Sequence, residues 1–203
     1  MPNLISHDAH LLIVNKPSGL LAVPGRGADK QDCLWARLRR DFPEALVVHR
    51  LDMATSGLML FARNRPMQRQ LSILFQQRQI FKRYEAVVAG RMEPAEGEID
   101  LPLSADWPQR PRQRIDTLHG KPALTRYRVL DAQDSRSRVA LEPVTGRTHQ
   151  LRLHLAAIGH PILGDALYGE AASAPRLLLH ACTLGFTHPA SGETLCIEHA
   201  PPF

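Results

Sequence analysis

The sequence lacks several features by which protein classes are recognised. No apolar run approaches the roughly 18 residues that a membrane-spanning helix needs, so we expect no membrane segment. The first residues show no basic start followed by an apolar stretch, so no signal peptide is expected. Only three cysteines occur, and they lie far apart. This spacing predicts reduced thiols in a cytoplasmic protein and argues against a disulfide scaffold.

Motifs for metals, cofactors and covalent hydrolases are also missing. Ten histidines occur, but none forms an HExxH motif, there is no CxxC, and the nearest mixed pair is His180 and Cys182. The loop Pro24–Gly27 has too few glycines for a nucleotide-binding fingerprint, and Ser56 does not stand in a G-x-S-x-G elbow. A glycosidase needs a second carboxylate in a similar context, and none recurs. We therefore expect neither a metal nor a cofactor.

Lysine is rare among the basic residues. Of the 25 Lys and Arg residues only four are Lys, and the net charge is +5 with a pI near 9.5. Arginine forms forked contacts to phosphate and stacks on bases, which favours a polyanionic partner such as RNA. Composition alone leaves an alternative open, because a GC-rich coding sequence also replaces Lys by Arg without any function.

The residues that are present predict one globular α+β domain over residues 1–203, with two lobes left open. A hydrophobic fraction of 44% is enough for a core. The patterns predict a mostly antiparallel mixed sheet flanked by about three helices. The expected strands are His10–Val14, Leu20–Val23, Ala45–Val48, Leu58–Ala62, Phe81–Gly90, Ala123–Leu130, Ser137–Glu142, Leu177–Phe186 and Leu195–Ile197. The expected helices run from an Asp32 cap to Arg40, over Pro66–Gln79, and from a Thr148 cap to Ile158, where a strand is the alternative.

Asp52 stands in a short polar connection between two apolar runs. Ala45–Val48 precedes it and Leu58–Ala62 follows it, with a Thr-Ser-Gly turn between. A loop pinned by strands on both sides can hold a reactive carboxylate in fixed geometry. The alternative is an Asp that only accepts hydrogen bonds from the amides of its turn.

The segment 91–122 contains five prolines, so we expect no long regular element there. Arg110, Arg112 and Arg114 alternate, which predicts three guanidinium groups on one side of an extended segment. Such a row is suited to RNA phosphates, but a solvated edge strand has the same pattern.

Five motifs together make the chain resemble the RluA family of pseudouridine synthases. They occur in the family's order and are His49-Arg50-Leu51-Asp52-x-x-Thr55-Ser56-Gly57-Leu58, Lys82-x-Tyr84, Thr145-Gly146-Arg147-x-His149-Gln150-Leu151-Arg152, His160-Pro161-Ile162-x-Gly164-Asp165 and Leu178-Leu179-His180-Ala181. The resemblance implies the pseudouridine synthase fold with a central active-site cleft. It also implies a reaction without cofactor or metal, in which the uridine N1–C1′ bond breaks and a C5–C1′ bond forms.

The resemblance also implies roles for individual residues. Asp52 matches the catalytic aspartate, acting as nucleophile or as base at the sugar. Tyr84 matches the residue that stacks on the uracil and accepts the C5 proton, and Arg147 matches the arginine that pairs with the aspartate. Arg50 matches an arginine that displaces the target nucleotide, and Leu179 an apolar residue under the base. The other residues expected to bind substrate are His49, Thr55, Lys82, Gln150, Arg110 and Arg112.

Two further stretches bear on the target. Residues 14–20 and 101–111 resemble a dual-specificity branch of this family, which implies stem-loops of 23S rRNA (position 746) and of tRNA (position 32) as partners. We expect no N-terminal S4 RNA-binding domain and a monomer. The alternatives are the same chemistry on a different uridine, or a non-catalytic RNA-binding protein.

Overall fold

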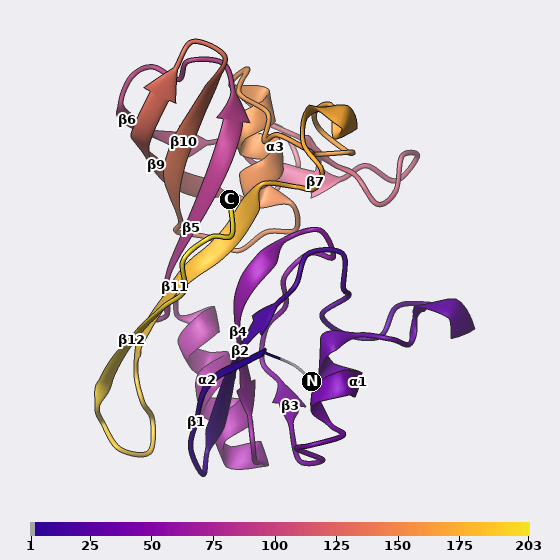
Figure 1. The fold of residues 1–203 in the computed structure, drawn as a ribbon, viewed down its shortest axis with the longest axis vertical. Coiled ribbons are helices and arrows are strands. Elements are labelled where there is room, and N and C mark those ends of the chain that lie inside the picture. The colour runs from indigo at the N-terminus through magenta and orange to yellow at the C-terminus, as the bar shows by residue number, and fades with distance from the viewer. Residues whose placement is uncertain (1–2) are drawn as a thin grey trace. The chain divides into compact units, whose positions relative to one another are not determined.

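The computed structural model describes residues 3–203, which form two compact units (Figure 1). Unit 1 comprises the chain up to Lys82 together with His180–Pro202, and unit 2 comprises Arg83–Leu179 with Phe203. The chain therefore passes from one unit to the other inside strand β5 (Phe81–Ala89) and again inside strand β11 (Leu179–Thr187).

Unit 1 is built on a sheet with the strand order β1-β2-β4-β11. Its further strands are β1 (Asn3–His7), β2 (Leu11–Lys16), β3 (Leu46–Val47), β4 (Ser56–Ala62) and β12 (Thr194–Glu198). All its pairings are antiparallel except that of β4 with β11, where Ser56 and Gly57 lie opposite His180 and Ala181. Strand β4 is buried along its whole length because it has neighbouring strands on both sides.

Gly57 permits the close approach of β4 to β11. Its φ is +117°, and a Cβ there would lie 2.3 Å from the carbonyl oxygen of Ala181. Any other residue would meet the neighbouring backbone and adopt an unfavourable conformation.

The helices of unit 1 are α1 (Leu34–Leu38), α2 (Arg65–Gln76) and the 3-10 turn η1 (Ala28–Lys30). Helix α2 begins where the Asn64 side chain accepts a hydrogen bond from the Met67 amide at 2.9 Å. Met67 and Leu71 on its inner face are buried with Leu58 and Leu60 of β4 in one apolar cluster. This cluster fixes the end of β4 that lies away from Asp52.

Unit 2 is an antiparallel sheet with the order β5-β10-β9-β6, together with a separate hairpin. Its elements are β6 (Glu96–Asp100), the hairpin β7 (Leu103–Ala105) and β8 (Gln113–Ile115), β9 (Leu124–Gln133), β10 (Arg136–Pro143), α3 (Gln150–Ala157) and η2 (Ala171–Ser173). Helix α3 packs on β9 and β10 (Figure 1), and its buried His154 bonds Thr125 Oγ1 and the Leu101 carbonyl, both at 3.0 Å.

Most expected elements are present, with shifted ends. The structure confirms the strands around residues 11–14, 58–62, 81–89, 124–130, 137–142, 179–186 and 195–197, and the region 151–157 is a helix. The strand predicted over Leu20–Val23 is wrong, because the carbonyls of Leu21 and Ala22 accept from Leu34 and Trp35 at the start of α1. Strand β1 was not predicted.

Both predicted helix caps are also wrong. Cys33 caps α1 through its sulfur, because both carboxylate oxygens of Asp32 bind Arg37 at 2.7 and 2.6 Å. His149, in a left-handed conformation with φ 55°, precedes α3 in place of Thr148. In both cases a side chain at the start of the helix contacts a later residue. Asp32 binds Arg37, and His149 contacts Tyr168.

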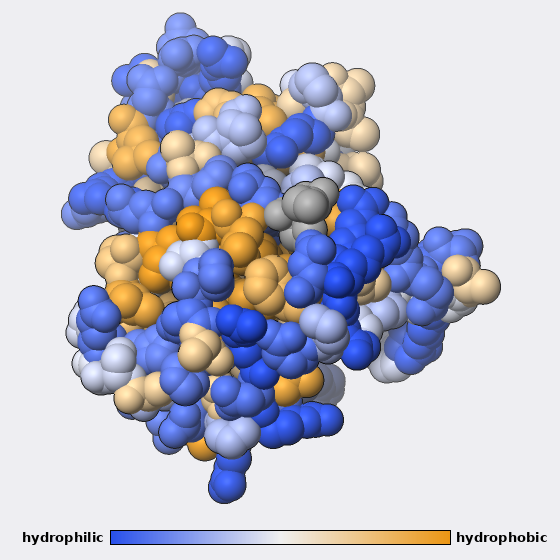
Figure 2. All heavy atoms as spheres, turned by 60° about the horizontal axis from the view of Figure 1, so that its bottom comes forward, coloured by the Kyte–Doolittle hydropathy of each residue, from blue (hydrophilic) through white to orange (hydrophobic). Residues whose placement is uncertain are grey.

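Apolar side chains are concentrated inside and charged ones outside. Hydrophilic residues cover much of the face drawn in Figure 2. No helix among residues 3–203 has both the length and the apolar character required to cross a membrane. In that same range, no disulfide joins the cysteines.

Candidate active site

The connection that carries Asp52 runs from residue 48 to residue 55 and joins β3 to β4; we call it the Asp52 loop. The predicted strand-to-strand position of Asp52 is thus confirmed. Asp52 is half-buried, and its carbonyl accepts a hydrogen bond from the buried Thr55 amide at 3.2 Å. The predicted Thr-Ser-Gly turn is wrong in part, because Ser56 and Gly57 already belong to β4.

Lys16 holds the Asp52 loop from the end of β2. Its side chain is fully buried, and Nζ donates to the carbonyls of Pro17, Leu20 and Met53 at 2.9, 2.7 and 2.9 Å. Ser18 Oγ donates to the Ala54 carbonyl at 2.6 Å. An ammonium group among carbonyl oxygens forms charge-assisted hydrogen bonds, which are stronger than neutral ones. The backbone on the C-terminal side of Asp52 is therefore fixed, while Arg50 and Met53 of the loop are exposed.

His49 fixes the other side of the loop. Its Nε2 accepts from the Leu60 amide at 2.9 Å, and its ring stacks on Phe75 with centroids 4.4 Å apart. Burial, reinforced by the nearby charge of Lys82, lowers the pKa of His49 to about 3. His49 is therefore neutral at pH 7 and its proton is on Nδ1, which suits an anchor of the loop.

A chain of polar side chains connects β4 with the end of unit 1. Ser56 Oγ lies 2.8 Å from His180 Nδ1, His180 Nε2 lies 3.1 Å from His199 Nδ1, and Asn15 Nδ2 lies 3.3 Å from His199 Nε2. With the Asn15 amide nitrogen as donor, each imidazole donates through Nδ1 and accepts through Nε2. The positions of the two histidines next to β4 are coupled through these contacts.

Two further predicted residues of unit 1 carry positive charge. Arg50 is exposed and makes no hydrogen bond or ion pair with residues 3–203. Lys82, at the unit 1 end of β5, is half-buried, and burial together with the charge of Arg78 lowers its pKa. Arg50 is thus available to an external anion.

In unit 2, Tyr84 and Leu179 occupy ordered strand positions. Tyr84 of β5 is half-buried and lies opposite Leu141 of β10. Leu179 is buried at the start of β11. The structure thus gives unit 2 an aromatic ring and an apolar side chain on its strands, whereas Asp52 belongs to unit 1.

Arg147 lies on a turn of residues 144–149, which we call the Arg147 turn. Gln150 holds this turn from inside: its Oε1 accepts from Thr145 Oγ1 at 2.7 Å and from the Arg147 amide at 3.0 Å. Its Nε2 donates to the Leu124 carbonyl and to Thr125 Oγ1 at 2.9 and 3.0 Å. Both ends of the Gln150 side-chain amide are thus hydrogen-bonded inside the protein.

The exposed part of the turn is short. Gly146, Arg147 and Thr148 are exposed, whereas Thr145 and Gln150 on either side are buried. Arg147 is exposed, and its Nε donates to the Pro122 carbonyl at 3.1 Å. The structure therefore presents a guanidinium group on a rigid base.

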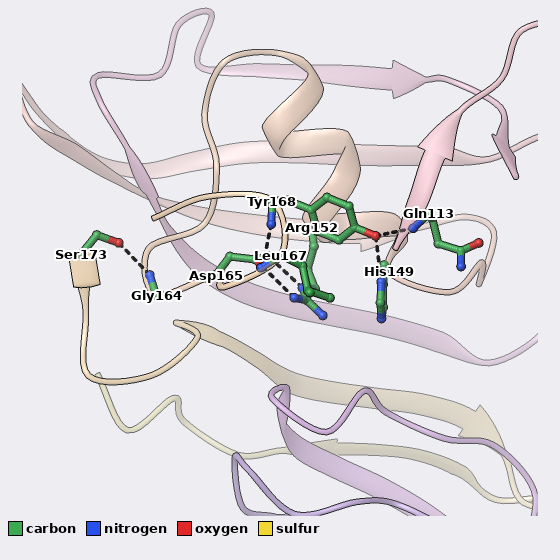
Figure 3. A network of polar contacts seen from close by, with 8 residues as sticks. All are labelled: Gln113, His149, Arg152, Gly164, Asp165, Leu167, Tyr168 and Ser173. Carbon is green, nitrogen blue, oxygen red and sulfur yellow. Dashed lines mark hydrogen bonds and ion pairs between the residues drawn. The ribbon is translucent and has the colours of Figure 1, made fainter. Parts of the chain in front are cut away.

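A second network holds the same turn through His149 (Figure 3). Tyr168 Oη lies 2.8 Å from His149 Nδ1 and accepts from the Gln113 amide at 2.6 Å. Buried Arg152 and Asp165 form a bidentate ion pair with distances of 2.7 and 2.6 Å. Although burial alone raises it, Arg152 and two backbone amides hold the pKa of Asp165 below its usual value.

The three alternating arginines do not form the predicted row. Residues 108–111 form a turn, and Arg110 stacks on exposed Trp107 with its guanidinium carbon 3.3 Å from the ring centroid. Arg112 lies 5.4 Å from the ring centroid of Tyr168, and Arg114 bonds Ser104 and Asp116. Because residues 108–111 form a turn, Arg110 does not share an extended segment with Arg112 and Arg114.

The anchors were not predicted from sequence. Each anchoring residue is separated by many positions in the sequence from the group that it contacts. These residues are Lys16, Ser18, His180, His199 and Tyr168. Within residues 3–203 no group of three or more His, Cys, Asp or Glu side chains is placed to bind a metal ion. The reactive groups among the predicted site residues are the carboxylate of Asp52, the phenol of Tyr84 and the guanidinium groups of Arg50 and Arg147.

Comparisons with known proteins agree with this inventory. A family model described as RNA pseudouridylate synthase matches residues 10–157. The Dual-specificity RNA pseudouridine synthase RluA of Escherichia coli (strain K12) is 49% identical over 98% of this chain and 93% of its own length. The protein of the same name from Salmonella typhi is 51% identical over 96% and 91%.

A solved structure extends the agreement to the fold. Human RNA Pseudouridylate Synthase Domain Containing 1 is 31% identical, covers 100% of this chain and 84% of its own, and has a TM-score of 0.83. The predicted α+β architecture with a mixed sheet and few helices is thereby confirmed.

Proposed function

Because the chain belongs to the RNA pseudouridylate synthase family, and is thus an RNA isomerase, we propose that it converts selected uridines of 23S rRNA and tRNA to pseudouridine. The observation that carries this proposal is the identity of about one half, over nearly the whole chain, to relatives named for dual specificity. The stem-loops that contain position 746 of 23S rRNA and position 32 of tRNA are the proposed targets.

The reaction assigns a task to each proposed catalytic residue. The N1–C1′ bond breaks, the uracil turns, C5 bonds to C1′, the C5 proton leaves, and N1 takes up a proton. Asp52 acts at the sugar as nucleophile or base, and Tyr84 stacks on the uracil and accepts the C5 proton. Arg147 pairs with the carboxylate of Asp52 and favours its ionised form. Anchored backbone on both sides of Asp52, and the rigid base of Arg147, support this assignment.

The remaining predicted residues divide into contacts and anchors. Arg50, exposed and uncommitted to the described chain, is proposed to displace the target nucleotide. Lys82, Leu179, Arg110 and Arg112 stay proposed RNA contacts. His49, Thr55 and Gln150 are proposed to position the loops, because their polar groups are bonded inside the protein. The protein is proposed to act as a monomer without a cofactor.

The test measures isomerisation on defined RNA. Transcripts of both stem-loops carry tritium at C5 of uridine, so bond formation at C5 releases tritium to water. We expect release from both stem-loops, and none when cytidine replaces the target uridine. Release only from another uridine would overturn the target assignment and leave the chemistry standing. No release from any rRNA or tRNA transcript would contradict the function itself.

A further inference from the structure

Tyr168 is the only residue of the described chain that bonds the backbone of β8 and the side chain of His149 through one atom. Its Oη lies 2.6 Å from the Gln113 amide nitrogen and 2.8 Å from His149 Nδ1 (Figure 3). No role in the reaction has been assigned to it above.

The protons of this contact can be assigned. An amide N–H only donates, so Tyr168 Oη accepts from Gln113. We assign His149 the tautomer with its proton on Nε2, in which Nδ1 accepts the single phenolic proton. Burial raises the pKa of Tyr168, so the hydroxyl keeps this proton over the range in which the protein would be assayed.

Tyr168 is itself rigidly held. Asp165 Oδ1 accepts from the amides of Leu167 and Tyr168 at 2.8 and 3.1 Å, and Arg152 binds both oxygens of Asp165. The guanidinium carbon of Arg152 also lies 5.3 Å from the centroid of the Tyr168 ring. Arg152 belongs to α3, the helix that starts directly after the Arg147 turn. The hydroxyl is therefore a fixed point relative to that helix.

The group that Tyr168 holds is conformationally unusual. His149 has a left-handed φ of 55°, which is uncommon for a residue other than glycine, and makes no side-chain cap on α3. Gln150 fixes the Arg147 amide, but only exposed Gly146, Arg147 and Thr148 lie between the two anchored ends of the turn. The bond to Tyr168 is a contact of the His149 side chain at the end of this turn.

We propose that Tyr168 is a positioning residue for the isomerisation, which acts by locking His149 and so setting the direction of the Arg147 side chain. This inference rests on the proposed function of Arg147. It predicts that the hydroxyl of Tyr168 influences the rate of the bound complex and leaves RNA affinity nearly unchanged.

The test compares single-turnover rates and RNA dissociation constants, with urea unfolding as a check of the fold. Tyr168→Phe keeps the ring and removes the hydroxyl, and we expect the rate to fall about tenfold, as for a slightly misplaced group. Tyr127→Phe, a hydroxyl loss elsewhere in unit 2, is the matched control and should retain the wild-type rate.

A second pair of variants separates positioning from general packing. In His149→Asn, the side-chain oxygen of asparagine replaces Nδ1 of histidine as the acceptor. Asparagine also tolerates the left-handed conformation. The rate of this variant should therefore stay within about threefold of the wild-type rate. His149→Leu has a similar width but no acceptor and should be as slow as Tyr168→Phe. In an Arg147→Lys background, Tyr168→Phe should slow the reaction by less than about twofold.

The outcomes are distinct. A wild-type rate for Tyr168→Phe, or a loss that simply multiplies with that of Arg147→Lys, would overturn the positioning role. Equal rates for His149→Asn and His149→Leu would do the same. An inactive wild-type protein would contradict the proposed function, and the inference with it.

Discussion

The Asp52 loop and the Arg147 turn are both rigid, but they are held by different kinds of contact. In the Asp52 loop, Lys16 and Ser18 bind the main chain from outside, as Lys16 does at the Met53 carbonyl, and His49 of the loop itself binds the Leu60 amide. In the Arg147 turn the anchors are side chains of the turn and of the helix after it, His149 and Gln150. The first arrangement leaves Arg50 and Met53 exposed and Asp52 half-buried, whereas the second leaves the three consecutive residues Gly146, Arg147 and Thr148 exposed.

The difference shows how each segment suits its proposed task. A carboxylate that meets a sugar benefits from a fixed backbone, which Lys16 and Ser18 supply without occupying the loop's side chains. An arginine has a long flexible side chain, so its direction depends on the turn that carries it. Substitutions at the two sets of anchors should therefore have different consequences.

The largest effect on stability should come from the buried ion pair beneath the Arg147 turn. Asp165→Asn leaves the buried guanidinium of Arg152 without its counter-charge, which should lower the free energy of unfolding by about 3 kcal/mol or more. Urea denaturation measures the change. Asp134→Asn removes a fully exposed partner of Arg91 and should change the stability by less than about 0.5 kcal/mol. Similar effects for both variants would contradict the role of burial.

A smaller loss is expected at the anchor of the Asp52 loop. Lys16→Met leaves three carbonyls without their charged donor, although it also removes the cost of burying the ammonium group. We expect a net loss of about 2 kcal/mol in urea and faster amide hydrogen exchange at Gly19 and Thr55. The exposed Lys30→Met is the control. If Lys16→Met left exchange in the loop unchanged, the loop would be held by other contacts.

The sequence could identify the segments that carry the reactive groups but not what holds them. Asp52 was predicted between two strands because apolar runs flank it, and that pattern is local. Lys16 reaches the Met53 carbonyl across 37 positions of the chain, so no local pattern reveals the contact. The same holds for Tyr168 and His149, which lie 19 positions apart.

Local rules failed where a competing contact was stronger. Asp32 and Thr148 are good capping residues, yet the ion pair with Arg37 and the left-handed His149 displace them. The alternation of arginines predicted an extended row, but Pro111 and the stacking of Arg110 on Trp107 favour a turn. These errors arise from side-chain contacts that a pattern of residue types does not contain.

The effect of pH on stability sharpens the comparison at His49. Since burial lowers the pKa of His49 to about 3, the unfolded chain binds a proton there below pH 6.5 and the folded one does not. Stability is therefore full above about pH 6.5 and falls with decreasing pH, by up to about 1.4 kcal/mol per unit, until about pH 3. His49→Gln keeps an acceptor for the Leu60 amide but does not titrate.

The measurement is the urea midpoint of both proteins between pH 7 and pH 4.5. The stability difference between them should narrow as pH falls, because only the wild type loses the contribution of His49. A difference independent of pH would show that His49 is not buried in its neutral form.

The central claim is that Asp52 performs the chemical step while other groups bind the RNA. Asp52→Asn keeps the size of the side chain and removes its charge and basicity. In single-turnover assays on the tRNA stem-loop, we predict a rate at least about a thousandfold below that of the wild type. The RNA dissociation constant should stay within about threefold. Pseudouridine formed by Asp52→Asn at the wild-type rate would contradict this account.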